Sequence, residues 1–291
     1  MPELPEVETI RRGLERLLIG YTITGVEVRF ARIFSGDPSK IINAKILAVK
    51  RFGKGLLIEL DNDMSIAIHV KMTGQLIFKG PKILKEFHPR LPLPLQLPNQ
   101  HTHVIFTLKV ANGELKNEGD EAILFYNDIR KFGWMKVVLT KDAKDLPFFK
   151  NLGFEPLNNL TIKQFNIIVK ASKAPLKSLL MDQQKIAGIG NIYANDALFA
   201  AGIDPRRNSS SLTKKEIENL FHAIELVLRK GIDAGGASDV NYLNVEGGKG
   251  SYQNHFLVYK QNGKPCKNCG TEIQRIKLAG RGTFFCPVCQ S

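Results

Sequence analysis

The four cysteines of the chain form two pairs with the same internal spacing. Cys266 and Cys269 are separated by two residues, as are Cys286 and Cys289. This spacing lets both thiolates of a pair face one ion, and a hairpin between the pairs would bring all four around it. Two disulfides are the alternative, which an intracellular compartment disfavours. We therefore expect one structural Zn²⁺ ion. Four thiolates would fill its coordination shell, so it would stabilise the fold and would not catalyse.

The N-terminal sequence Met1-Pro2-Glu3 offers a second kind of chemistry. Removal of Met1 would expose the secondary amine of Pro2, and an α-amino group titrates near pH ~8. Such an amine can attack the anomeric carbon of a sugar and form an imine, while Glu3 beside it could move protons. The alternative is an ordinary helix start, where a carboxylate favours the positive end of the helix dipole. The two residues alone leave both interpretations open.

The charge of the chain favours a polyanionic partner. Lys and Arg number 41 against 28 Asp and Glu, which gives a formal charge of +13. Basic side chains that contact phosphates release condensed counterions, although a basic surface can also serve solubility alone. Between the cysteine pairs, Gly280 and Gly282 permit a tight turn with Arg281 at its tip. An arginine in that position could bind a phosphate bidentately.

Hydrophobic periodicity predicts the elements that position these residues. Residues 3–19 predict an amphipathic helix that Gly20 ends. From Tyr21 to about Leu139, short apolar segments predict a β-sandwich or barrel, and after about Phe148 the pattern is helical. The clearest predicted strands are 56–60, 65–70, 104–110 and 136–139, and the predicted helices are 165–171, 176–187, 191–201 and 213–230. The proline-rich stretch 81–98 predicts an exposed loop, and residues 231–250 predict a mobile, glycine-rich one.

Composition limits the class of protein. Hydrophobic residues make up 43% and charged residues 24%, as in ordinary globular chains, and 291 residues favour two domains. No apolar run approaches the ~18 residues that a membrane helix needs. Glu3, Glu6 and Glu8 also make the N-terminus unlike a signal peptide. We therefore expect an intracellular protein, cytoplasmic and associated with the nucleoid.

Four motifs, taken together, resemble the bacterial formamidopyrimidine-DNA glycosylase family over essentially the whole chain. They are the segments 2–9 (PELPEVET), 128–133 (DIRKFG) and 188–194 (GIGNIYA), and the cysteine-containing tail. The resemblance implies an α+β fold with an N-terminal helix and β-sandwich, a helix–two-turn–helix domain and a zinc-finger hairpin. The domain boundaries that it implies are 1–140 for the catalytic β-sandwich, 148–232 for the helix–two-turn–helix domain, 233–254 for a flexible lesion-capping loop and 255–289 for the zinc finger.

The resemblance also implies an activity. It predicts a bifunctional DNA glycosylase and AP lyase of base excision repair that acts as a monomer, with no membrane partner, on double-stranded DNA containing oxidised purines or abasic sites. The excised bases would be 8-oxoguanine and formamidopyrimidines, followed by β- and δ-elimination. Pro2 matches the Schiff-base nucleophile and Glu3 the general acid, with Glu6 as a supporting carboxylate. Lys54 matches the lysine of β-elimination and phosphate contact, and Arg281 the arginine of the δ step.

Further residues match positions that contact DNA in the family. Met72, Arg130 and Phe132 match a trio that fills the space left by the extruded nucleotide, although core packing is the alternative for Met72 and Phe132. Lys177 and Asn191 match contacts to the DNA backbone, and His101 matches a DNA-contacting histidine. Lys173 lies close to another family contact, a position for which Ser172 and Lys170 compete. Asn191 is also placed to cap the helix that follows it.

The chain departs from the family pattern at Ile129, which stands where a proline is usual, and at Thr102, which replaces an aspartate. The first alternative function is that of an endonuclease VIII-like glycosylase for oxidised pyrimidines, against which Leu4 and the Met/Arg/Phe trio argue. The second is a non-catalytic zinc-ribbon protein that binds nucleic acid. It gives no reason for Pro2 beside Glu3.

Overall fold

The computed structural model describes residues 1–81, 96–110, 121–239 and 241–291. The chain forms two compact units. The first comprises Met1–Pro2, Glu6–Lys150 and Gly235–Ser251, and the second Glu3–Pro5, Asn151–Ala234 and Tyr252–Ser291. Most of the predicted proline-rich loop, residues 82–95, lies outside the described residues. No helix in the described part of the chain is long and apolar enough to cross a membrane.

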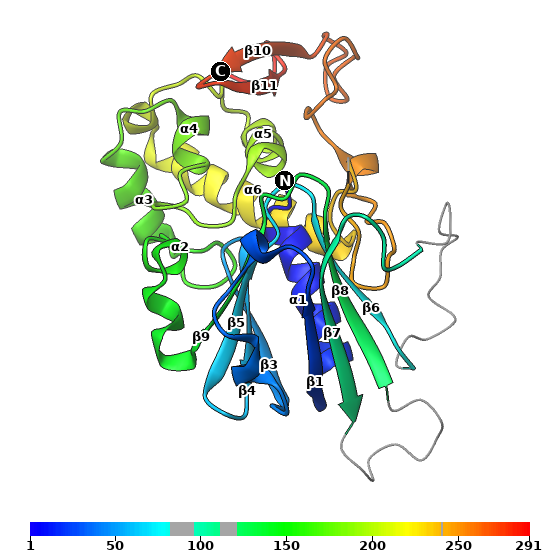
Figure 1. Ribbon diagram of the computed structural model, residues 1–291. Coiled ribbons are helices and arrows are strands. Elements are labelled where there is room, and N and C mark those ends of the chain that lie inside the picture. The colour runs from blue at the N-terminus through cyan, green and yellow to red at the C-terminus, as the bar shows by residue number, and fades with distance from the viewer. Residues whose placement is uncertain (82–95, 111–120, 240) are drawn as a thin grey trace. The chain divides into compact units, whose positions relative to one another are not determined.

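Two β-sheets dominate the first unit (Figure 1). The four-stranded sheet has the order β1 (Tyr21–Val28), β7 (Thr102–Val110), β8 (Glu121–Asp128) and β6 (Gly74–Lys79). The five-stranded sheet has the order β2 (Phe34–Ser35), β9 (Trp134–Leu139), β5 (Met64–His69), β4 (Gly55–Leu60) and β3 (Ile46–Phe52). Among these strands only β2 and β9 pair in parallel. The four clearest predicted strands are thus confirmed, and each begins one or two residues earlier than expected.

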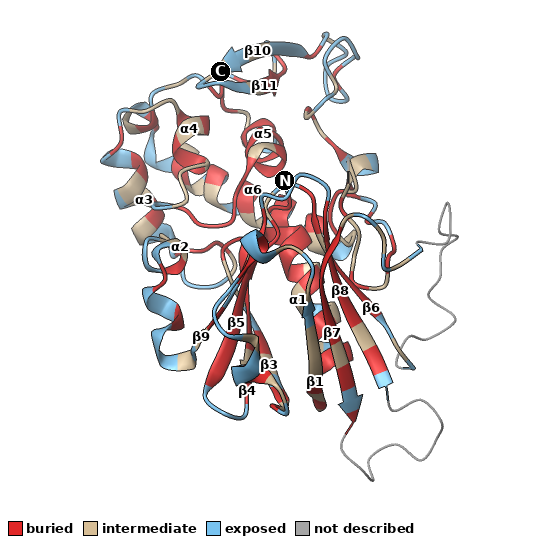
Figure 2. Cartoon of the chain, viewed as in Figure 1, coloured by how far each residue is buried: buried red, intermediate tan, exposed pale blue. Residues whose placement is uncertain are grey.

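Helix α1 (Leu4–Leu18) shares one apolar core with both sheets. Val7, Leu14 and Leu17 of the helix have no exposed surface, and the strands contribute buried side chains to the same cluster (red in Figure 2). Burial of each such leucine stabilises the fold by roughly 1.5–3 kcal/mol. Gly20 adopts φ +93°, which confirms it as the helix stop. Among its described residues, the first unit also contains α2 (Pro147–Lys150) and the short 3₁₀ helices Ala31–Ile33, Pro38–Ile41 and Thr140–Asp145.

The second unit is built from helices and one hairpin. Its helices are α3 (Ile162–Lys170), α4 (Leu176–Leu180), α5 (Asn191–Ala200) and α6 (Lys214–Asp233), with 3₁₀ helices at Ser209–Ser211 and Tyr252–His255. The hairpin pairs β10 (Gln274–Leu278) with β11 (Arg281–Phe285). Thr161 and Thr213 each begin a helix with a capping box, which explains why α3 and α6 start there. The chain therefore has the predicted α+β fold, with two sheets and α1 in the first unit and with helices and a hairpin in the second.

Two boundary predictions in this unit are wrong. The helix predicted over 176–187 ends at Leu180. The Asp182 amide donates to the Leu179 carbonyl three residues back, and the Asp182 carboxylate then accepts from the Gln184 amide, which turns the chain out of the helix. The glycine-rich loop predicted from residue 231 begins later, because α6 continues to Asp233. Gly231 packs so closely that a Cβ there would lie 2.5 Å from the Tyr193 ring. Mobility of the following segment stays a prediction.

Candidate functional site

Glu3 occupies the N-terminal end of α5. Its side chain is 3% exposed, and its carboxylate oxygens accept hydrogen bonds from the amides of Ile192, at 2.9 Å, and Tyr193, at 3.4 Å. A carboxylate is stabilised there by the unpaired amides and the helix dipole. Gly190 precedes the helix, and a Cβ on it would lie 2.3 Å from Cδ of Glu3. The expectation that Asn191 caps this helix is wrong, because Asn191 is the first helical residue and Glu3 satisfies the amides.

Pro2 precedes Glu3 directly and is buried, whereas Met1 is half-exposed. Glu6, one turn into α1, is 1% exposed and links the helix to the segment Gly235–Ser251. Its carboxylate accepts from the Ala237 amide at 2.8 Å, and its carbonyl accepts from the Tyr242 hydroxyl at 3.3 Å. Burial, together with the Glu6 charge, raises the pKa of Tyr242, so this hydroxyl stays protonated and keeps donating. Glu6 therefore supports the predicted lesion-capping loop.

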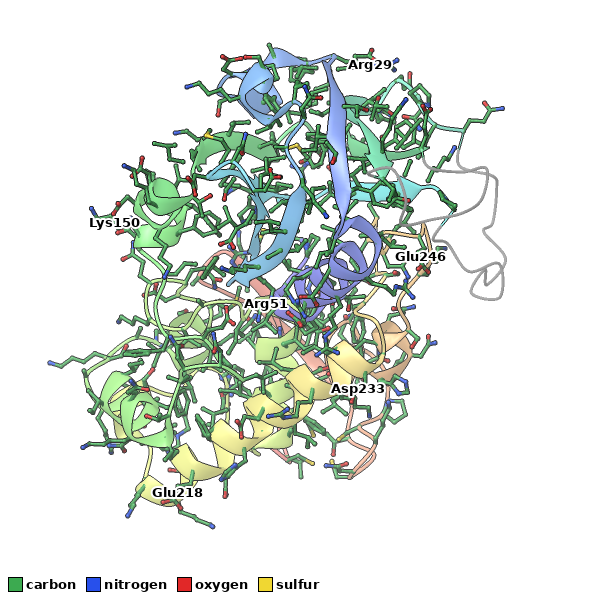
Figure 3. The ribbon with its side chains drawn as sticks, turned by 90° about the horizontal axis from the view of Figure 1, so that it is seen from below. Arg29, Arg51, Lys150, Glu218, Asp233 and Glu246 are labelled. Atoms are coloured by element: carbon green, nitrogen blue, oxygen red, sulfur yellow. The ribbon has the colours of Figure 1, made fainter. Side chains whose placement is uncertain are left out.

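Glu8 links α1 to the turn that carries Lys54. Its carboxylate accepts from Arg51 Nε at 2.9 Å, and Arg51 Nη1 donates to the carbonyl of Gly53 at 2.9 Å (Figure 3 labels Arg51 beside α1). Gly53 adopts φ +55°, a conformation that favours glycine, and Lys54 after it is 4% exposed. The position of Lys54 is thus set by a chain of contacts that starts on the helix following Pro2.

Glu8 gives a testable pH dependence. Burial alone would raise its pKa, but hydrogen bonds from Arg11, Arg51 and Arg12 lower it from 4.5 to about 2. Because the folded-state pKa is depressed, this stabilisation is complete above pH 4.5 and is lost as the pH falls through about 2. Glu8→Gln is expected to lower the free energy of unfolding by about 1.5–3 kcal/mol at pH 7. In urea titrations of both proteins, this difference should shrink as the pH falls from 4.5 to 2. A difference that does not change with pH would contradict it.

The three predicted void-filling residues lie together in the first unit. The Arg130 guanidinium lies over the Phe132 ring, 4.7 Å from its centroid, and Arg130 Nη1 is 3.0 Å from the Met72 sulfur. Met72 is 43% exposed and Phe132 is 55% exposed, which excludes core packing for both. Ile129 beside them is also half-exposed. An arginine stacked on an exposed ring forms a flat, preordered surface.

His101 lies next to this group. Its carbonyl accepts from the Asp128 amide at 2.9 Å, and its own amide donates to Asn99 Oδ1 at 2.8 Å. Thr102, one of the departures from the family pattern, accepts from the Asn99 amide at 2.9 Å and donates to Asn127 at 2.7 Å. Thr102 therefore stabilises the turn that contains His101.

The structure distinguishes the lysines predicted to contact DNA. Lys173 is exposed, whereas Ser172 is buried and the Lys170 amine donates to two backbone carbonyls. Of the three candidates for this position, Lys173 has the side chain best placed to reach a ligand. Lys177 differs from it, because only 2% of its surface is exposed.

Lys177 supports the hairpin that carries Arg281. Its Nζ donates to the Gly282 carbonyl and to Thr283 Oγ1, both at 2.8 Å, and Asn191 Nδ2 donates to the same Gly282 carbonyl at 3.2 Å. Burial, followed by the nearby Arg281 charge, lowers the pKa of Lys177 to about 7. The structure thus gathers Arg281, Lys177 and Asn191, three predicted site residues, around one stretch of β11. A cavity of about 170 Å³ lies between α4 and the hairpin, lined by Lys177, Ser178, Met181, Asp182, Leu278, Ala279 and Arg281.

The hairpin turn has a different composition from the predicted one. Ala279 and Gly280 form it, with φ +47° and +76°, and Arg281 pairs across it with Leu278. Gly282 lies in β11, where it pairs with Lys277, and not in the turn. Arg281 is exposed and is the first residue of β11, so it lies directly after the tip and not at the tip as predicted.

The four cysteine sulfurs lie within 4.8 Å of one another. Sγ of Cys266 is 3.8 Å from that of Cys289, and Sγ of Cys269 is 3.5 Å from that of Cys286. Zn–S bonds of ~2.3 Å at tetrahedral angles place thiolates ~3.8 Å apart, so these residues fit one zinc ion. Amides of Asn268 and Cys289 also point at the sulfurs of Cys266 and Cys286, at 3.4 Å each. The tail is a structural zinc site.

Asp196 is a residue that sequence reasoning missed. It has no exposed surface, and its carboxylate accepts from the amides of Leu257, Val258 and Tyr259 and from the Tyr252 hydroxyl at 3.1–3.2 Å. Burial raises its pKa. Asp196 therefore fixes the chain that enters the zinc finger to α5. A lone acid within an apolar helical stretch was the available signal.

Comparisons with known proteins find relatives that match this chain. Family models match three successive parts of the chain: the formamidopyrimidine-DNA glycosylase N-terminal domain at residues 1–135, the H2TH domain of the same enzyme at 152–241, and a zinc finger found in FPG and IleRS at 263–291. The formamidopyrimidine-DNA glycosylases of Desulfitobacterium hafniense and Heliobacterium modesticaldum are 38% and 40% identical to it over the full length of both chains.

Solved structures with the same fold include DNA complexes. A mutant of the Lactococcus lactis FPG bound to Fapy-dG-containing DNA superposes with a TM-score of 0.84 at 32% identity, and the match covers both chains completely. The Lactococcus lactis Fpg bound to DNA containing an abasic site gives a TM-score of 0.83 at the same identity and covers 99% of each chain.

Proposed function

Because the chain belongs to the formamidopyrimidine-DNA glycosylase family and is a DNA-repair enzyme with glycosylase activity, we propose that it excises oxidised purines and then cleaves the strand. Its substrates are 8-oxoguanine and formamidopyrimidines in double-stranded DNA, and also abasic sites. One observation carries the proposal: the Glu3 carboxylate, directly after Pro2, is held in place by two amides of α5. A proton-transfer group fixed next to the terminal amine is what imine chemistry at a sugar requires.

In the proposed reaction, Met1 is removed and the Pro2 nitrogen attacks C1′ of the damaged nucleotide. As the bond between nitrogen and C1′ forms, Glu3 protonates the ring oxygen and the sugar ring opens. The glycosidic bond then breaks, the base leaves with the proton of the Pro2 nitrogen, and an iminium ion between Pro2 and C1′ remains. That cation acidifies the C2′ hydrogen, so loss of this proton expels the 3′ phosphate in β-elimination. A second elimination expels the 5′ phosphate, and water then releases the sugar remnant from Pro2.

Other residues bind and orient the DNA in this scheme. A base inside a duplex cannot present its sugar to a buried amine, so the nucleotide rotates out and Met72, Arg130 and Phe132 fill its place. Lys54 contacts a phosphate and serves β-elimination, and Arg281 serves the δ step. His101 and Lys173 contact the DNA, and Lys177 and Asn191 contact its backbone. In the tail, Cys266, Cys269, Cys286 and Cys289 would hold zinc, which supplies folding energy and no catalytic step.

We also propose the organisation predicted from the sequence. It comprises a catalytic domain over 1–140, a helix–two-turn–helix domain over 148–232, a lesion-capping loop over 233–254 and a zinc finger over 255–289. The protein acts as a monomer on nucleoid DNA in the cytoplasm. The family match and the +13 charge support this partner.

Borohydride trapping tests the function. Reduction of the imine should covalently join the protein to an 8-oxoguanine duplex, and mass spectrometry should map the adduct to Pro2. A variant such as Pro2→Glu, which retains Met1, should give no adduct. Stronger trapping with dihydrouracil or thymine glycol would favour the endonuclease VIII-like alternative. Binding without trapping of any lesion would favour the non-catalytic alternative. An adduct on a lysine would overturn the mechanism.

A further inference from the structure

Asp128, the last residue of β8, bonds to two separate segments of the first unit. Its side chain has no exposed surface. One carboxylate oxygen accepts from the Thr73 hydroxyl and, at 3.2 Å, from the Arg130 amide, and the other accepts from the Gly133 amide at 2.7 Å. The Arg130 amide also donates to Thr73 Oγ1 at 3.0 Å. A single carboxylate thus connects the residue after Met72 to both ends of the segment 130–133.

The surroundings leave this carboxylate little freedom. A Cβ on Gly133 would lie 1.7 Å from the Tyr126 hydroxyl and 3.1 Å from Asp128 Oδ2, and a Cβ on Gly74 would lie 2.7 Å from the same hydroxyl. The Tyr126 hydroxyl is buried and has no hydrogen-bond partner among the described residues. His103 Nε2 lies 2.8 Å from the Asp128 carbonyl. Gly74, Gly133 and the Tyr126 ring therefore pack tightly around the Asp128 carboxylate. If this carboxylate were displaced, the buried groups that donate to it would be left unpaired.

The side chains that these segments present are exposed. Met72 comes from one segment and Arg130 and Phe132 come from the other, and Arg130 contacts both of its neighbours at the surface. We propose that Asp128, together with Thr73, is the positioning residue that holds this trio in one arrangement. This inference rests on the proposed role of the trio in replacing an extruded nucleotide. A preformed wedge pays no ordering cost when the base leaves the duplex.

The expected effect is on nucleotide extrusion. Asp128→Asn replaces one of the two acceptor oxygens by an NH2 donor. The one oxygen that remains cannot accept from both the Thr73 hydroxyl and the Gly133 amide. We expect extrusion, followed by stopped-flow fluorescence of 2-aminopurine placed beside 8-oxoguanine, to slow about tenfold. Single-turnover base release from a lesion in a duplex should slow by the same factor as extrusion. Release from a lesion in single-stranded DNA should slow clearly less. In a variant whose thermal unfolding is unchanged, equal slowing from the paired and the single-stranded lesion would overturn the inference.

Thr73 provides a matched pair of variants that differ in whether the hydroxyl is kept. Thr73→Val keeps the volume but loses the hydroxyl, and Thr73→Ser keeps the hydroxyl. Valine should reproduce the slow extrusion, and serine should restore the wild-type ratio of paired to single-stranded rates. Equal ratios for valine and serine would overturn the proposal, even if Asp128→Asn fails to fold.

Arg130→Ala separates failure of this inference from failure of the proposed function. If Arg130→Ala does not slow extrusion, the trio does not fill the void and the premise is wrong. If Arg130→Ala slows extrusion while Thr73→Val and Asp128→Asn do not, the premise stands and the positioning role is wrong. In support of the proposal, the double variant Asp128→Asn/Arg130→Ala should be no slower than Arg130→Ala alone.

Discussion

Glu3→Gln is expected to slow base release about 10²–10⁴-fold, the range that a positioned general acid contributes. Glutamine retains an oxygen that can accept from the Ile192 amide, so the end of α5 should stay intact. It cannot transfer a proton to the opening sugar. Single-turnover release of 8-oxoguanine measures the loss, and unchanged thermal unfolding would show that the fold is preserved. A decrease smaller than tenfold would assign proton transfer to another group.

Gly190→Ala tests the same carboxylate from the opposite side. The new methyl group would lie 2.3 Å from Cδ of Glu3, so the carboxylate must move from the amides that hold it. We expect base release to fall in the same direction as for Glu3→Gln. Gly25→Ala in β1 is the matched control, because a Cβ there meets only Thr107 at an ordinary 3.4 Å. Activity that survives Gly190→Ala would mean that the placement of Glu3 does not matter.

Removal of zinc, by chelation or by Cys269→Ser, is expected to abolish tight DNA binding. Structural zinc contributes an apparent ~10–16 kcal/mol to folding in zinc-finger peptides, so without it the hairpin should not hold its shape. Cys266 and Cys286 belong to a small buried cluster with Phe199, Ile273 and Phe284, which would open at the same time. Arg281 would then no longer be fixed above Lys177.

The experiment compares zinc content with affinity for a duplex containing an abasic site. Arg281→Ala is the reference, and zinc loss should cost at least as much affinity as this single substitution. The slope of log affinity against log salt should also become shallower, by ~0.9 for each phosphate that the protein no longer neutralises. Affinity that persists after complete zinc loss would contradict the proposed role of the hairpin.

Sequence patterns predicted those features that depend on neighbours along the chain. The apolar spacing of α1, the stop at Gly20 and the two-residue gaps between cysteines are local, and all three were confirmed. The features that were missed depend on distant partners. Glu3 and the amide that it accepts from are 189 residues apart, and Lys177 and Gly282 are 105 residues apart. No periodicity reports such a contact. Asn191 therefore seemed to be the cap, and the hydrogen bond from Lys177 to Gly282 was not predicted.

The same distinction applies to the predicted void-filling residues. The sequence named Met72, Arg130 and Phe132 by resemblance, but not the groups that hold them. Asp128 was part of a quoted motif and Thr73 was not singled out, because an aspartate or a threonine at a strand end is common in any sheet. The structure alone distinguishes them, because Thr73 and Gly133, from two separate segments, both donate to the Asp128 carboxylate.

The Lys177 amine donates to two acceptors, Gly282 O and Thr283 Oγ1. A neutral primary amine still carries two N–H groups, so both bonds persist after the proton leaves. With a pKa of about 7, this group exchanges its third proton near neutrality. Mild alkalinisation therefore removes a positive charge near Arg281 without breaking the hydrogen bonds to β11. The attraction of this part of the hairpin for an anion can thus change with pH while its structure does not.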